Sequence, residues 1–208
     1  MTGESAIALL AFLFPLAYSP GPGNAFFAAI GASKGLKAAL PALSGYHVAT
    51  LIVTALIGVG MGVTILSNPV ISKTLAAAGS IYVLWLAWGF IRSARSRAAP
   101  GAESLVGRAS GFWSGAVVLL LNPKAYHIIA AMFTQFLSPP ANEEMFTIAT
   151  ITVIFTLNNF IAFVVWALTG RALTVLFRGE RSKQLIDYLF AATLVGVAIW
   201  MLLPLFTQ

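Results

Sequence analysis

The sequence predicts an all-α membrane protein with six transmembrane helices, arranged as two inverted three-helix repeats. Three observations predict this class. Of the 208 residues, 59% are hydrophobic and only 9% are charged, whereas soluble domains carry about 25% charged residues. Six apolar runs approach or exceed the roughly 20 residues that a helix needs to cross a bilayer. In each half of the chain, the first of these runs is interrupted by proline.

The first half of the chain holds three of these runs, at residues 5–30, 38–66 and 74–91. The first run is broken at Pro20-Gly21-Pro22-Gly23, because two prolines remove two backbone donors and disfavour helical geometry in the residues before them. The other two runs are predicted to be continuous helices, since lipid leaves a backbone no partner outside its own helix. Residues 1–91 are therefore predicted to form the first repeat.

Residues 92–110 are rich in Arg, Ser, Ala and Gly and are predicted to be a cytoplasmic connector. The second half follows as residues 111–208, and both halves are expected to form a single integral membrane domain. Because each half has an odd number of helices, the two halves insert in opposite orientations. The runs of the second half cover residues 111–137, with a break at Asn122-Pro123, then residues 146–170 and 185–206.

The basic residues predict the orientation of the chain. Of the twelve Lys and Arg residues, ten lie in loops on one side of the predicted spans, Lys73 lies on the other side, and Lys124 lies within the fourth span. The positive-inside rule places the ten in the cytoplasm, so both termini are predicted to be periplasmic or extracellular. The ten are Lys34, Lys37, Arg92, Arg95, Arg97, Arg108, Arg171, Arg178, Arg181 and Lys183.

Lys124 is the most informative residue, because it lies at the midpoint of the otherwise uncharged run 111–137. A lysine at the centre of a span costs roughly 2.5–3.5 kcal/mol on insertion scales, so it predicts a polar interior site. Pro123 favours the start of a half-helix there, with Asn122 as its cap. The positive end of that half-helix and the lysine together suit a substrate carboxylate. The alternative is a lysine that reaches the interface.

The first break predicts the other side of the same site. Pro20, Gly21, Pro22, Gly23 and Asn24 cannot continue a helix, and the freed carbonyls at this depth need partners from protein, water or substrate. Paired interruptions in two inverted halves are the best sequence pointer to a transporter site. We therefore expect this elbow and residues 122–124 to bind substrate. The alternative is a packing kink, or the cytoplasmic end of the first helix.

Four further polar residues lie within the predicted spans. Asn158 and Asn159 form a pair in the fifth span, where they either line the solute path or hydrogen-bond between helices. His47 and His127 are candidates, with Lys124, for proton coupling, because histidine titrates near physiological pH. The alternative for both histidines is a structural hydrogen bond to a neighbouring helix.

Several kinds of site are not predicted. The chain has no cysteine, and two histidines without a carboxylate in the spans make a poor metal site. The basic residues form no stripe with interleaved aromatics, so nucleic-acid binding is not expected. No motif of an intramembrane enzyme is present, and no cofactor or enzyme activity is predicted. Without an acidic residue deep in a span, a neutral zwitterion or an anion is the expected substrate.

Two motifs give the chain a resemblance to a known family. The sequence SPGPGN followed by GASKGLKAAL, and GFWSGAVVLLLNPKA followed by FTQF, resemble the LysE/RhtB family of amino-acid exporters over nearly the whole chain. The resemblance implies efflux of amino acids across a bacterial inner membrane, driven by the proton gradient. Many members carry an acidic residue near the position of Asn158 and Asn159, and this departure leaves the coupling and the substrate charge open.

The function predicted from the sequence is therefore secondary active export of small, neutral amino acids or their derivatives from the cytoplasm, by proton antiport. The expected partners are the amino-acid substrate, protons and the lipid bilayer, and faces of small residues allow a homodimer without requiring one. A passive pore or ion channel built by a homo-oligomer is the alternative, although nothing in the sequence resembles a selectivity filter.

Overall fold

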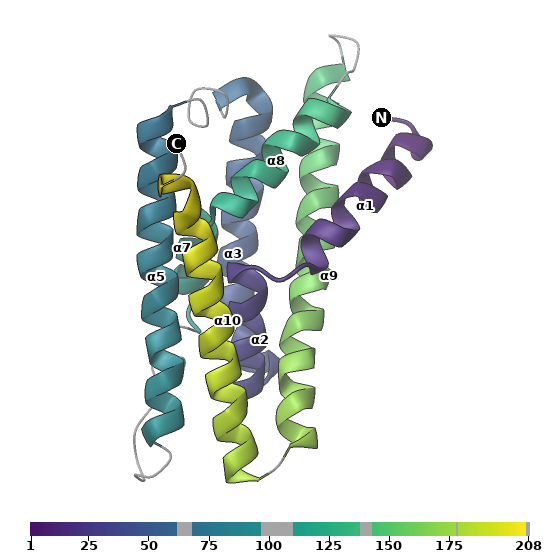
Figure 1. Cartoon of the computed structure of the whole chain (residues 1–208). Coiled ribbons are helices and arrows are strands. Elements are labelled where there is room, and N and C mark those ends of the chain that lie inside the picture. Colours follow the sequence, from purple (N-terminus) through teal and green to yellow (C-terminus); the bar gives the residue numbers. More distant parts are fainter. Residues whose placement is uncertain (62–67, 97–109, 138–142, 178, 207–208) are drawn as a thin grey trace.

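The computed structural model describes residues 1–61, 68–96, 110–137, 143–177 and 179–206, and within these ranges every regular element is a helix (Figure 1). Four helices are long and apolar enough to cross a membrane alone, and two bent pairs raise the number of candidate spans to as many as six. The predicted all-α membrane class is confirmed. The four are α3 (Leu36–Leu56), α5 (Pro69–Ser96), α9 (Glu144–Leu176) and α10 (Glu180–Phe206).

The two bent pairs lie where the sequence predicted broken helices. Helices α1 (Gly3–Tyr18) and α2 (Pro22–Lys34) meet at 61°, and α7 (Phe112–Leu120) and α8 (Pro123–Phe136) meet at 64°. A proline occupies the first turn of both α2 and α8, where its fixed φ suits a helix start and its missing N–H breaks no hydrogen bond. The inverted relation between the two halves stays a prediction.

Some predicted boundaries differ from the observed ones. The second span, predicted as residues 38–66, leaves α-helical geometry after Leu56 and passes through a π-type turn at Ile57–Met61. Gly60 has a φ of +93° there, a conformation that glycine adopts without steric cost. Helix α5 runs on to Ser96, so the predicted connector 92–110 begins as helix; its residues 97–109 lie outside the described ranges.

The bundle has two distinct ends. We call the end that carries Lys34, Arg95 and Arg171 the basic end, and the opposite end, where both chain termini lie, the terminal end (Figure 1). Helices α2 and α7 occupy the half of the bundle towards the basic end, and α1 and α8 occupy the half towards the terminal end (Figure 1). Both breaks therefore fall near the middle of the bundle.

Glycines let helices touch backbone to backbone in the half towards the basic end. A Cβ at Gly31 on α2 would collide with the carbonyl oxygen of Ala167 on α9, and one at Gly170 on α9 with that of Ala28. Without a hydrophobic force between helices in lipid, such close backbone approach is a main source of packing energy. Gly45 and Gly115 join α3 to α7 in the same way, against the carbonyls of Phe112 and Ala42.

The half towards the terminal end is held by side chains instead. Helices α1 and α8 lean away from the bundle axis there (Figure 1), and the rings of Phe12 and Phe136 meet at 5.7 Å between centroids. A cluster of apolar side chains fills the space between α1, α8 and the rest of the bundle. Its buried members are Leu9, Leu13, Ile57, Tyr126, Ile129, Met132, Phe133, Ile148, Ile151 and Phe155.

Candidate functional site

The two helix breaks meet at Lys124. This lysine lies in the first turn of α8, is half-buried, and points its ammonium group at the α1–α2 break. Its three hydrogen bonds to described residues all go to that break: 2.8 Å to the Ser19 hydroxyl, 3.2 Å to the Ser19 carbonyl and 3.3 Å to the Pro20 carbonyl. The side chain therefore turns towards the middle of the protein and not towards a membrane surface.

The α1–α2 break, residues 19–21, forms an extended elbow that exposes backbone oxygens. Ser19 has φ −70° and ψ 146°, and Gly21 has φ −172° and ψ 176°. Pro20 and Pro22 have no backbone N–H, so the carbonyls that would accept from them in a helix need other donors. Asn24 supplies one such donor, because its Nδ2 donates to the Ala17 carbonyl across the break at 2.7 Å.

The elbow glycines allow close approach of other side chains. A Cβ at Gly21 would lie 3.2 Å from the Lys124 Nζ and 3.4 Å from the Asn24 Oδ1. A Cβ at Gly23 would lie 2.6 Å from the ring of Phe163 on α9. The lysine thus lies directly against the elbow backbone, and larger residues at either position would push it or α9 away.

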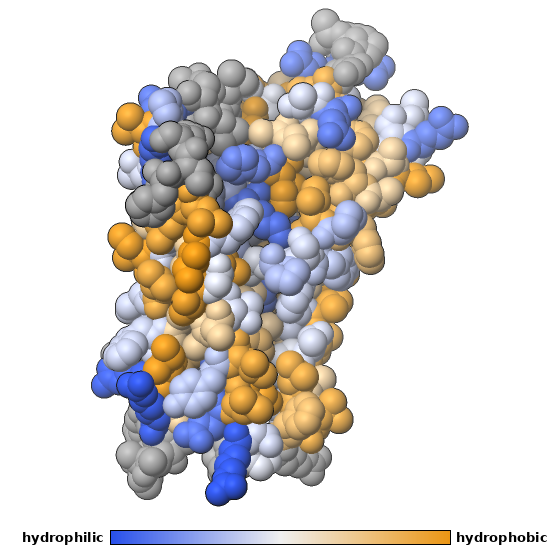
Figure 2. All heavy atoms as spheres, in the orientation of Figure 1, coloured by the Kyte–Doolittle hydropathy of each residue, from blue (hydrophilic) through white to orange (hydrophobic). Residues whose placement is uncertain are grey.

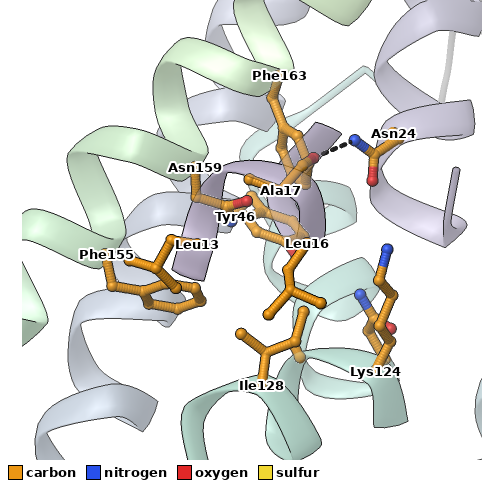
Figure 3. A pocket seen from close by; sticks show the side chains of 12 residues that line it. Leu13, Leu16, Ala17, Asn24, Tyr46, Lys124, Ile128, Phe155, Asn159 and Phe163 are labelled. Carbon is orange, nitrogen blue, oxygen red and sulfur yellow. Dashed lines mark hydrogen bonds between the residues drawn. The ribbon is translucent and has the colours of Figure 1, made fainter. Parts of the chain in front are cut away.

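A small central pocket lies on one side of Lys124 (Figure 3). Its volume is about 20 Å³, which is room for about one water molecule. Figure 3 shows Asn24 and Lys124 on one side of the pocket and Phe155, Asn159 and Phe163 of α9 on the other. The remaining lining residues are Leu13, Leu16, Ala17, Tyr46, Asn122, Ala125 and Ile128.

A larger lateral hollow lies on the other side of Lys124, between the elbow and α10. Its volume is about 450 Å³, within the range of about 300–1,000 Å³ that is usual for small-molecule sites. On this face Figure 2 shows hydrophilic colour in a recess between apolar surfaces. The hollow is lined by Ser19, Pro20, Gly21, Lys124, Thr193, Gly196, Val197 and Trp200.

Asn122 does not act as predicted. It occupies the cap position of α8, but its side chain makes no capping hydrogen bond, and its buried Oδ1 has no partner among the described residues. The side chain instead lies beside the hydroxyl of Tyr46, which also interacts with Asn159. The Asn122 carbonyl accepts the Ala125 N–H at 3.0 Å and closes the first turn. The prediction of a side-chain cap is therefore wrong.

The structure brings some of the other predicted residues to the site and leaves others outside it. Pro22, Gly23 and Pro123 shape the breaks but line neither cavity, and Asn158 is half-buried outside both. His127 is exposed on α8 with its Nδ1 2.7 Å from the Pro123 carbonyl. His47 is buried on α3 against Phe160 and Phe163.

Several residues of the site were not predicted from the sequence. Tyr46 and Phe163 looked like ordinary core residues, because their polar or ring contacts appear only when α3 and α9 pack. Ser19 precedes the elbow prolines but was not predicted to bind. Thr193 and Trp200 on α10 carried no signal, since both are exposed and tryptophan is common on membrane helices near the interface.

Comparison with known proteins now identifies the family. The family model described as LysE type translocator matches residues 14–204. The chain belongs to this family. The resemblance inferred from the two proline motifs is thereby confirmed.

Named relatives of this LysE type translocator are efflux proteins. The chain is 26% identical over 200 residues to a cysteine/O-acetylserine efflux protein of Klebsiella pneumoniae subsp. pneumoniae, covering 96% of this chain and 97% of that protein. It is 25% identical over 201 residues to the protein of the same description in Escherichia coli strain K12, covering 96% and 98%. No solved structure matches the chain significantly.

Proposed function

We propose that this translocator exports small, neutral amino acids or their derivatives, with Lys124 and the elbow as the substrate site. The observation that carries the proposal is the set of three hydrogen bonds from the Lys124 ammonium to oxygens of Ser19 and Pro20. It joins the two broken helices at one point, beside a hollow of ligand size. The cysteine/O-acetylserine efflux relatives support the same chemistry.

The pairing of Lys124 with the elbow favours a zwitterionic substrate. The ammonium has three donors and all are used, so a carboxylate binds only by replacing elbow oxygens. Those oxygens then need a new donor, because polar groups left unpaired at this depth are costly. An amino acid carries both groups: its carboxylate takes Lys124, and its ammonium takes the Ser19 and Pro20 carbonyls. The two carbonyls thereby regain a donor, and the Ser19 hydroxyl keeps its own hydrogen bond to the Leu16 carbonyl.

The walls of the site favour a substrate with an uncharged side chain. Beyond the elbow and Lys124, the lateral hollow is lined by Thr193, Gly196, Val197 and Trp200, none of which carries a charge. Asp187, the acidic residue buried on α10, lines neither cavity. A substrate with a second cationic group would have no carboxylate to meet among these lining residues.

The same geometry supports transport by alternating access. The site lies where α1 and α8 turn away from α2 and α7, so rocking of these half-helices would expose it to one side at a time. We take the proton gradient as the driving force and the bacterial inner membrane as the location. In this proposal the basic end faces the cytoplasm, as the positive-inside rule predicts.

A transport assay with a matched pair of lysine variants tests this proposal. The purified protein is reconstituted into lipid vesicles. The vesicles are loaded with radiolabelled cysteine, O-acetylserine or other small amino acids, and efflux is followed with and without a pH gradient. Lys124→Ala is expected to abolish transport of every substrate, whereas Lys73→Ala, which alters an exposed lysine on α5, is expected to leave it unchanged. Normal efflux by Lys124→Ala would refute the site.

The passive pore remains the second candidate from the sequence, and the same vesicles distinguish it. Efflux through a carrier saturates with substrate concentration and is accelerated by unlabelled substrate on the opposite side. A pore gives flux that rises without saturation and a measurable conductance. Non-saturating flux through the wild-type protein would refute the proposal of an exporter, regardless of the result for Lys124→Ala.

A further inference from the structure

A stripe of polar side chains runs along one face of α3. His47, Thr50 and Thr54 are spaced by three and four residues, which places them on the same side of the helix. All three are buried, with exposed fractions of 7%, 0% and 0%. The His47 ring meets Phe160 and Phe163 of α9, and one turn beyond Thr54 the next residue on the same face, Gly58, lies against Ile148 of α9. This face of α3 therefore packs against α9.

Helix α9 carries a matching stripe. Thr152, Thr156 and Asn159 are spaced by four and three residues, which places them on one side of the helix, and all are buried, with exposed fractions of 5% to 7%. The two helices run in opposite directions, and the contacts at His47 and at Gly58 bracket the segment between Ile148 and Phe163. Thr54 and Thr152 thus lie at similar levels of one interface. We call this interface, with its six polar side chains, the threonine seam.

Several atoms of the seam have unmet hydrogen-bonding capacity. His47 Nε2, Thr54 Oγ1 and Thr152 Oγ1 are buried and have no partner among the described residues. A buried polar atom without a partner costs about 1–3 kcal/mol. Valine has the shape of threonine without this cost, so a seam that served packing alone would favour valine. The unpartnered atoms instead favour a small hydrogen-bonding partner such as water.

His47 is positioned to accept a proton at the inner end of the seam. Its Nδ1 lies 2.7 Å from the Leu43 carbonyl, and a carbonyl only accepts, so Nδ1 must carry a hydrogen. The unpartnered Nε2 of the neutral ring is then the basic nitrogen. Tyr46 is the titratable side chain in contact with the ring, and the α9 residues around the ring are Phe160, Phe163 and, through its backbone, Asn159.

We propose that the threonine seam is a hydrated proton path that joins the terminal end of the bundle to His47. This inference rests on the proposed proton-coupled export and specifies its route. The hydroxyls of Thr152 and Thr54 relay the proton through water, and His47 Nε2 accepts it about half-way through the membrane. Metal ions are a poorer occupant, since no group of three or more His, Cys, Asp or Glu residues gathers in the described ranges.

The test separates proton coupling from substrate transport. Thr54→Val, Thr152→Val and His47→Gln are compared in vesicles with Thr169→Val, which changes an exposed threonine of α9 that bonds to its own helix. Two quantities are measured: exchange of labelled for unlabelled substrate at equal pH, and pH-gradient-driven accumulation with proton movement followed by a pH-sensitive dye. The seam variants are expected to keep exchange and lose gradient-driven accumulation and proton movement. Thr169→Val is expected to keep all three.

The conservative variant Thr152→Ser guards against a purely structural effect. It retains the hydroxyl, so it is expected to retain gradient-driven transport, and thermal unfolding of each variant in detergent confirms folding. The path is refuted if Thr54→Val, Thr152→Val and His47→Gln all keep proton movement, if they lose exchange as well, or if sodium rather than a pH gradient drives the wild type. Absence of exchange in the wild type would instead refute the proposed exporter itself.

Discussion

The half of the bundle towards the basic end and the half towards the terminal end are built on different principles. Towards the basic end, Gly31, Gly45, Gly115 and Gly170 let whole helices meet through their backbones. Towards the terminal end, α1 and α8 lean outward and are held by interlocking side chains such as Phe12 and Phe136 (Figure 1). The first kind of contact is short and rigid, whereas side chains change rotamer and slide.

This difference indicates which side of the site is closed. Lys124 and the elbow lie at the boundary between the two halves, beside the lateral hollow. If the basic end faces the cytoplasm, as the positive-inside rule predicts, the glycine contacts close the cytoplasmic side of the site. The conversion to an inward-facing form would then require these contacts to separate.

The largest effect is expected from filling a glycine contact. Gly170→Val would place a side chain where the Ala28 carbonyl lies, and we expect a loss of about 3 kcal/mol of stability because two backbones cannot repack. Thermal unfolding in detergent measures this loss. The control is Gly196→Val, because a Cβ at Gly196 meets nothing within 4 Å. Equal melting temperatures for the two variants would contradict the claim that backbone contacts at glycines hold the half towards the basic end.

Cysteine labelling probes the same contrast in the membrane, because the natural chain has no cysteine. Ile128→Cys changes a half-buried residue of α8, in the half towards the terminal end, whereas Ile30→Cys changes a fully buried residue of α2. A small, charged thiol reagent is expected to label Ile128→Cys at least about tenfold faster, since a buried thiol reacts only through opening of the structure. Substrate should slow the labelling of Ile128→Cys, because this residue also borders the central pocket beside Lys124. Similar rates at both positions would contradict the contrast between the two halves.

A smaller and more selective effect is expected in the lateral hollow. Gly196→Leu should project into the hollow and lower kcat/KM by about tenfold, more for larger substrates than for small ones. Folding should be unaffected. Ala192→Leu, on an exposed position of α10 that does not line the hollow, is the matched control. Unchanged transport by Gly196→Leu would place the substrate on the other side of Lys124.

Local chemistry made the helix breaks predictable. Pro22 and Pro123 favour a helix start, because the missing N–H and the fixed φ are properties of the residue itself. A proline alone does not impose a break, since Pro15 and Pro41 lie inside α1 and α3. The cost of a charge at mid-membrane likewise singles out Lys124 from its position in the sequence alone. The family could be recognised for the same reason, since its motifs are these breaks.

Features that depend on the third dimension were not predictable. The sequence predicted a substrate carboxylate as the partner of Lys124 and left the partner of the elbow carbonyls open, but in this structure the lysine and the carbonyls satisfy each other. Asn122 looked like a cap, but its side chain lies beside Tyr46, a partner more than seventy residues away in the chain. Thr193 and Trp200 join the hollow only because α10 packs beside the elbow.

The bond between Lys124 and Ser19 bears on how the transporter resets after it has released its cargo. If the lysine had no partner after substrate release, its unpaired charge in the membrane would oppose the return of the empty site. Such a carrier would work only by exchanging one substrate molecule for another. Here the Ser19 and Pro20 oxygens act as a built-in counter-ligand. If Lys124 anchors the cargo, the vacant transporter can return without a passenger, and the driving gradient alone then sets the direction of net flow.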